Sequence, residues 1–247
     1  MIDIDSLDQL TAVSSVDGRY RDKIQELAPI VSEFGLIKNR IQVECEWLLF
    51  LSATEEISEV RKLEESEQAA IRGIYSDLTV EDAERVKDIE KITNHDVKAI
   101  EYYVKDRLKE QPGLVEFIEW IHFACTSEDI NNTAYAIMLS HARSDVLMNV
   151  MKTLTDEIDL MANSNASVAM LSRTHGQVAS PTTLGKELRN SSERLKRQLV
   201  QFEKLEILGK FNGAVGNFNA HQSAYPNLDW PTLSADFLDR LGLSINQ

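Results

Sequence analysis

The densest group of reactive side chains lies in the run SRTHGQ at residues 172–177. It holds a guanidinium (Arg173), an imidazole (His175) and an amide (Gln177), together with two hydroxyls and a glycine at which the backbone can approach a ligand closely. Histidine is the side chain whose ordinary pKa suits proton transfer near neutral pH. We therefore interpret His175 as a candidate acid or base, with a solvated loop of the same composition as the alternative.

A second polar run, TNHD at residues 93–96, interrupts two helical repeats of apolar residues. Asn94, His95 and Asp96 can end one helix and cap the next, or they can face a ligand, because short polar side chains compete with helical hydrogen bonds. Both interpretations stay open on this run alone. A second histidine motif elsewhere in the chain favours the ligand.

The run TSED at residues 126–129 has the spacing of a helical capping box. Thr126 and Ser127 then stand at a helix N-terminus, where unpaired N–H groups and the helix dipole favour an anion. Plain capping accounts for the same residues. A fourth run, DGRY at residues 17–20, predicts a turn that exposes Arg19 and Tyr20.

The apolar residues that lie between these runs recur at helical spacing, which predicts an all-α fold. Ser32 is the expected N-cap of a helix over residues 32–52, and Thr79 opens another with a capping box. Ser180 and Pro181 form a start signal for a rod of about 28 residues that stops at Gly209. We find no strand-rich region. Further helices are expected near residues 67–76, 97–108, 114–121, 129–161 and 233–241.

Composition narrows the class of partner. The net charge is −14, from 26 basic and 40 acidic residues, which argues against broad binding to nucleic acid or an anionic membrane. No run of 18 apolar residues occurs and residues 1–10 are acidic, so we expect neither a membrane span nor a secretory signal. Cys45 and Cys125 lie among apolar residues without metal-ligand spacing, which indicates reduced core residues of a cytoplasmic protein.

Taken together and in their order along the chain, 17–20, 93–96, 126–129 and 172–177, the four runs resemble the motifs of adenylosuccinate lyases, a branch of the fumarase/aspartase superfamily. A fifth run, LGKFNGAVGN at residues 208–217, is also similar to a segment of those enzymes. The resemblance covers nearly the whole chain. Val178 is a small departure, since proline is common there in the family.

The resemblance implies an N-terminal helical domain over residues 1–111, followed by part of a long-helix bundle domain over residues 112–247. It also implies a homo-oligomer, a tetramer in the intact enzyme, and a small nucleotide as substrate. The reaction would be β-elimination of fumarate from adenylosuccinate and from a succinylated carboxamide ribonucleotide. No metal or organic cofactor is expected.

The same resemblance assigns roles to the residues of the four runs. His175 would be the general acid, and His95 would assist at the substrate. Thr126 and Ser127 would hold a succinyl carboxylate, because hydroxyls and helix-end N–H groups suit an anion. The further substrate contacts would be Arg19 and Tyr20 at the phosphate, and Asn94, Asp96 and Gln177.

One family feature has no counterpart in residues 1–247. The mobile loop Gly-Ser-Ser-x-Met-Pro-x-Lys-x-Asn, which supplies a serine as general base, is not found in the sequence. We therefore expect the chain to correspond to the first half of such an enzyme and to be inactive alone. A helical scaffold or interaction protein whose polar runs are only caps is the alternative.

Overall fold

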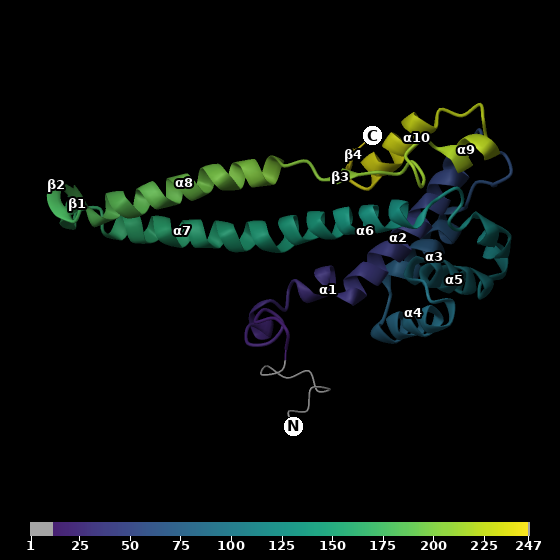
Figure 1. Cartoon of the computed structure of the whole chain (residues 1–247), viewed down its shortest axis with the longest axis horizontal. Helices are drawn as coiled ribbons and strands as arrows, with labels where there is room; N and C mark the ends of the chain where they lie inside the picture. The colour runs from purple at the N-terminus through teal and green to yellow at the C-terminus, as the bar shows by residue number, and fades with distance from the viewer. Residues whose placement is uncertain (1–11, 247) are drawn as a thin grey trace, which may run out of the picture. The chain divides into compact units, whose positions relative to one another are not determined.

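The computed structural model describes residues 12–246, and most of them are helical (Figure 1). The all-α prediction is therefore confirmed. The described residues form two compact units: the first holds residues 12–140 and 207–246, and the second holds His141–Glu206. The predicted domain boundary between residues 111 and 112 lies inside the first unit and stays a prediction.

Helix α2, Glu33–Ala53, forms the centre of the first unit. The hydroxyl of Ser32 accepts the N–H of Gly35 at 3.3 Å, so the predicted N-cap is confirmed. Most residues of α2 are buried on all sides, as expected for a central helix. Trp47 packs against Phe211 and Phe237, with ring centroids 4.6 and 4.9 Å away, and these rings join α2 to the later part of the chain.

The other elements of the first unit surround α2. The predicted capping box at Thr79 is confirmed, since Thr79 and Asp82 cap each other's backbone. Pro112 begins a 3₁₀ helix where the sequence predicted a stop followed by a short helix. The elements are η1 Arg21–Lys23, α1 Ala28–Val31, α3 Glu65–Ser76, α4 Val80–Thr93, α5 Asp96–Lys109, η2 Pro112–Trp120, α6 Ser127–His141, β3 Leu208–Gly209, α9 Asn219–Ala224, α10 Trp230–Arg240 and β4 Ser244–Ile245, with β3 and β4 paired in parallel.

The second unit is built on two long helices, α7 Met148–Ser164 and α8 Leu184–Lys204, which lie side by side (Figure 1). The π-helical segment η3, Ala142–Leu147, precedes α7. Gly185 allows the close approach of α8 to the end of α7, because a Cβ at this position would lie 2.3 Å from the carbonyl oxygen of Ala162.

The helices α7 and α8 are joined by an antiparallel hairpin of β1, Ala169–Thr174, and β2, Gln177–Thr183. The prediction that a helix starts at Ser180 and Pro181 is therefore wrong, because both residues lie in β2. Thr183 caps α8 instead, its hydroxyl accepting the N–H of Lys186 at 3.2 Å. Pairing of β2 with β1 outweighs the local Ser-Pro signal, and the proline is tolerated because a two-stranded sheet consists only of edges. The helix is correspondingly shorter, at 21 residues.

Candidate functional site

The turn at residues 93–96 joins α4 to α5. Asn94 ends α4 in the left-handed region (φ 52°), and His95 caps α5 by accepting the N–H of Lys98 on Nδ1 at 3.2 Å. A neutral imidazole that accepts on Nδ1 carries its proton on Nε2, so the outward nitrogen of His95 is a donor. The capping interpretation is thus correct. It uses only Nδ1 of His95, so Nε2 remains available to a ligand.

Asp96 is held from two sides. Its Oδ1 accepts the N–H of Val97 at 2.8 Å, and its Oδ2 accepts from the guanidinium of Arg40 at 2.6 Å. Partial burial by itself raises the pKa of Asp96, but the Val97 N–H and the Arg40 charge outweigh it and the pKa is lowered. The carboxylate therefore stays charged. A hollow of about 490 Å³ lies over this turn, lined by Lys87, Glu90, Lys91, Asn94, His95 and Asp96.

The start of α6 forms only half of the predicted capping box. Asp129 Oδ2 accepts the N–H of Thr126 at 2.9 Å, but the N–H of Asp129 donates to the Thr126 carbonyl at 3.0 Å and not to its hydroxyl. Among the described residues, neither the Thr126 nor the Ser127 hydroxyl has a hydrogen-bond partner in this structure. Both hydroxyls thus remain available to a ligand at a helix N-terminus.

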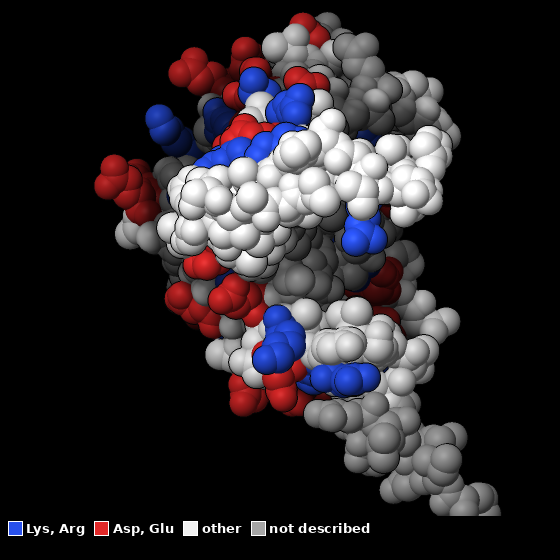
Figure 2. Space-filling view, turned by 90° about the vertical axis from the view of Figure 1, so that its left-hand side faces the viewer, with Lys and Arg blue, Asp and Glu red and all other residues white. Residues whose placement is uncertain are grey.

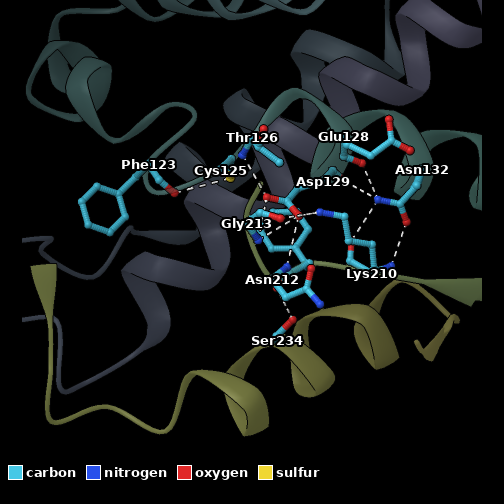
Figure 3. A network of polar contacts seen from close by, with 11 residues as sticks. Phe123, Cys125, Thr126, Glu128, Asp129, Asn132, Lys210, Asn212, Gly213 and Ser234 are labelled. Atoms are coloured by element: carbon cyan, nitrogen blue, oxygen red, sulfur yellow. Dashed lines mark hydrogen bonds and ion pairs between the residues drawn. The ribbon is translucent and has the colours of Figure 1, made fainter. Parts of the chain in front are cut away.

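A buried carboxylate anchors this helix start (Figure 3). Asp129 is fully buried, and its Oδ1 accepts from Lys210 Nζ at 2.8 Å and from the N–H groups of Asn212 and Gly213 at 3.1 and 3.2 Å. Asn132 adds two bonds to the Lys210 backbone, at 2.7 and 3.0 Å. The run at 208–217 is therefore tied directly to the start of α6. The sequence showed both runs, but not the ion pair that joins them.

The residues 121–125 that precede α6 form a tight turn in which His122 and Ala124 both have left-handed backbone (φ 64° and 59°). Glu44, fully buried on α2, holds the imidazole of His122, with 2.6 Å between Oε1 and Nδ1. Burial by itself lowers the pKa of His122, but the hydrogen bond and charge of Glu44 outweigh it and the pKa is raised. Our sequence analysis missed Arg40, Glu44 and His122. The usable signal was that Arg40 and Glu44 lie four residues apart, next to the apolar residues Ile41, Val43 and Cys45.

Arg19 and Tyr20 lie in the expected turn near the start of the described residues. The Arg19 guanidinium lies 5.4 Å from the centre of the Tyr20 ring, and Tyr20 is exposed. The neighbouring ion pair between Arg21 and Asp17, at 2.5 Å, closes the same turn. The contact with a phosphate stays a prediction.

His175 occupies the tip of the β1–β2 hairpin in the second unit. His175 and Gly176 have φ of 51° and 73° between the paired residues Thr174 and Gln177, a two-residue turn of the kind that favours glycine at one position. Histidine is among the few residues enriched in left-handed backbone. The imidazole and Gln177 are exposed, and residues 168–183 contain a single formal charge, Arg173, so the hairpin surface is almost uncharged (Figure 2).

The structure thus brings part of the predicted site together. Within the first unit, Arg40 bonds both to Asp96 and, at 2.8 Å, to Asn131 of α6, so it links the turn 93–96 with the helix that Thr126 and Ser127 begin. His175 and Gln177 belong to the second unit. The other predicted site residues, at 19–20, 94–96 and 126–127, belong to the first unit.

Comparison with known proteins decides the family. Residues 18–246 match the family described as lyase. The chain belongs to this lyase family. It is 51% identical over 240 residues to adenylosuccinate lyase of Haemophilus influenzae and 49% identical to that of Escherichia coli, covering 97% of this chain and 53% of each relative. The chain therefore spans about half the length of these curated relatives.

Solved structures support the fold of the family. A 3-carboxy-cis,cis-muconate lactonizing enzyme from Pseudomonas putida aligns over 90% of this chain and 48% of its own, with a TM-score of 0.68 and 19% identity. A fumarate lyase from Mesorhizobium aligns over 92% of this chain and 49% of its own, also with a TM-score of 0.68 and 19% identity. At this identity the likeness concerns the fold alone.

Two further properties concern the described residues 12–246. No group of three or more His, Cys, Asp and Glu side chains there is arranged to hold a metal ion, and none of the helices is long and apolar enough to cross a membrane. Cys45 and Cys125 are unpaired, as predicted, and burial raises the pKa of both thiols well above its ordinary value.

Proposed function

We propose that this lyase eliminates fumarate from adenylosuccinate, leaving AMP, and from the succinylated aminoimidazole carboxamide ribonucleotide. The observation that supports the proposal most is the identity of about half the residues to adenylosuccinate lyases across 97% of the chain. The four polar runs lie within that match. Two unpaired cysteines fit a cytoplasmic enzyme of this kind.

In the proposed reaction, a base removes a proton from the succinyl carbon next to a carboxylate. The electron pair forms the double bond of fumarate, the carbon–nitrogen bond breaks, and an acid protonates the departing nitrogen. We assign the acid to His175, because an exposed imidazole at a hairpin tip can reach into a site that other elements build. Arg173 is the single formal charge of the hairpin around it, so we assign most of the stabilisation of the developing negative charge to donors of other elements.

The first unit supplies the proposed contacts for the anionic parts of the substrate. Thr126 and Ser127 offer two hydroxyls without a partner among the described residues, and Ser127 adds the N–H of the first residue of α6, to a succinyl carboxylate. His95 offers an Nε2–H donor, since its Nδ1 is occupied by the cap. Arg19 and Tyr20 bind the nucleotide phosphate, for which a guanidinium fork has suitable geometry. Asn94, Asp96 and Gln177 complete the substrate contacts.

We further propose that the general base comes from the portion of the relatives' length that these 247 residues do not match. A positioned base contributes about 10²–10⁴-fold to such a reaction, and loss of the loop that carries it also admits water. The 247-residue polypeptide alone should therefore cleave adenylosuccinate at a small fraction of a relative's rate.

The test mixes this polypeptide with a separately made C-terminal half of the Haemophilus influenzae relative and follows adenylosuccinate absorbance. Cleavage that appears only on mixing supports both proposals. Full activity of the polypeptide alone would exclude the assignment of the base to another segment. No cleavage by the mixture, despite a stable complex of the two pieces, would count against the function and favour a helical scaffold.

A further inference from the structure

One face of the buried helix α2 carries three polar groups at helical spacing. Arg40, Glu44 and Trp47 lie at positions i, i+4 and i+7, and their exposed fractions are 5%, 0% and 1%. Charged residues this deeply buried are rare unless they are paired. We call these three residues the α2 stripe.

The first member of the stripe fixes the turn 93–96. The Nη2 of Arg40 donates to Asp96 at 2.6 Å, and its Nε donates to Asn131 of α6 at 2.8 Å. Both bonds use the same planar guanidinium, so the turn and α6 keep a fixed distance and orientation. The turn holds His95, and α6 begins at the Thr126-Ser127 pair.

The other two members fix the turn before α6. Glu44 Oε1 pairs with His122 Nδ1 at 2.6 Å, and Trp47 Nε1 donates to the carbonyl of Phe123 at 2.9 Å. This turn contains two left-handed residues that are not glycine, His122 and Ala124. Backbone of that kind persists only where surrounding contacts hold it, and it concentrates at functional sites.

The charged groups around His122 determine how deprotonation of its imidazole affects the turn at residues 121–125. Glu44 faces it from α2, and its second oxygen, Oε2, has no hydrogen-bond partner among the described residues. From α5, Glu101 adds a further negative charge and Lys98 a positive one. If His122 loses its proton, Glu44 becomes a buried carboxylate without a cation against it, which is unfavourable.

We propose that the α2 stripe is the positioning element of the substrate site, and that protonated His122 is needed to hold the Thr126-Ser127 helix start in its binding geometry. This inference rests on the proposed function, since it concerns how the site for the substrate carboxylate is held. Arg40, Glu44 and His122 hold the turn 93–96 and the Thr126-Ser127 helix start in place, and they are therefore positioning residues. They do not themselves touch the substrate.

The test is Glu44→Gln in the 247-residue protein, followed by ¹⁵N NMR of the backbone and of the histidine side chains. The amides of Thr126 and Ser127 should shift in the wild type as His122 titrates, and this coupling should be lost in the variant. Fumarate, used as the probe for the carboxylate site, should bind at least about tenfold more weakly to the variant, because small misplacements of binding groups are costly.

The control is Glu46→Gln, the same substitution on the same helix. Glu46 pairs with Arg72 at 2.9 Å and with Tyr75 at 2.8 Å, and within residues 12–246 it bonds to neither turn. This variant should keep the wild-type amide shifts and fumarate affinity. Because Glu44→Gln could destabilise the fold, His122→Asn is the second variant: asparagine tolerates left-handed backbone but does not titrate. It should remove the pH response.

Three results separate the possibilities. Wild-type amide shifts and fumarate affinity in Glu44→Gln would overturn the positioning role. A pH response that survives in His122→Asn would overturn the role of the proton. If the wild type binds no fumarate, the proposed function fails. The positioning role is still tested in that case, because the amide shifts of Thr126 and Ser127 during the titration of His122 do not require fumarate.

Discussion

At the scale of single residues, His175 combines exposure with a backbone conformation that few side chains adopt. Its φ of 51° makes asparagine the best substitution, because asparagine accepts left-handed backbone and alanine does not. In the reconstituted enzyme described above, His175→Asn should lower turnover by about 10²–10⁴-fold, the usual contribution of a general acid.

The control for His175 is His141→Gln in the same unit, an exposed histidine that pairs with Asp145 at 3.0 Å. This variant should retain turnover. Activity of His175→Asn within about tenfold of the wild type would remove His175 from the role of acid.

The Glu44–His122 pair gives stability a pH dependence of known sign. The pKa of His122 is raised in the folded protein, so its contribution is fully present below the ordinary histidine pKa of about 6.5 and is lost as the pH rises through the folded value. The difference in unfolding free energy between wild type and Glu44→Gln should therefore narrow above about pH 6.5.

Urea unfolding of both proteins from pH 5 to 9 measures this difference. His221 has the opposite effect: burial lowers its pKa, so its contribution is lost as the pH falls below about 6.5. Because His221 is present in both proteins, it cancels in the difference. A difference that does not vary with pH would contradict the prediction.

At the scale of elements, the buried Asp129 carboxylate holds the 208–217 run against α6. Asp129→Asn keeps the shape but removes the charge opposite Lys210. Breaking a buried pair in this way should destabilise the first unit by about 3–5 kcal/mol. Chemical denaturation checks the value, and Asp17→Asn, which removes an exposed carboxylate paired with Arg21, should have little effect.

The close approach of α7 and α8 depends on Gly185. A Cβ there would lie 2.3 Å from the Ala162 carbonyl oxygen and 2.6 Å from the Ala166 Cα, and backbone atoms cannot rotate away. We expect Gly185→Ala to destabilise the second unit by about 1–3 kcal/mol, the usual effect of overpacking.

Gly73→Ala in α3 is the matched control, because its nearest atom is a flexible side chain 3.6 Å away. It should be neutral or stabilising, since alanine is favoured over glycine inside a helix. Thermal unfolding of both variants decides the matter, and equal melting temperatures would contradict the packing argument.

At the scale of the whole molecule, the second unit exposes large apolar side chains at helical spacing. Those at helical spacing are Leu147, Val150, Leu154 and Met161, and α8 also exposes Val200 and Phe202. Exposed apolar faces of this kind mark association surfaces. We propose that copies of the chain cover them, as expected for a homo-oligomer, and that multi-angle light scattering at micromolar concentration will give a mass above 28.0 kDa.

Leu154→Glu should weaken that association, because it places a charge within the apolar face. The control Thr153→Glu adds the same charge at the adjacent exposed position and should leave the mass unchanged. A wild-type chain that runs as a monomer would exclude the proposal for this polypeptide.

The sequence by itself determined the features that depend on near neighbours. Ser32 and Thr79 cap helices through bonds that span three residues, so their spacing in the chain contains the whole interaction. The break at residues 93–96 is equally local. The order of the four runs also indicated the lyase family that the comparisons confirm.

Only the tertiary structure decided which distant groups meet. Arg40 bonds residues 56 and 91 positions away, and Lys210 meets Asp129 across 81 positions, distances at which no local pattern specifies a partner. The Ser180-Pro181 signal failed for a different reason, since the competing hairpin lies close by in the chain. Pairing of β2 with β1 satisfies backbone groups along the whole hairpin, and this outweighs a start signal formed by two residues.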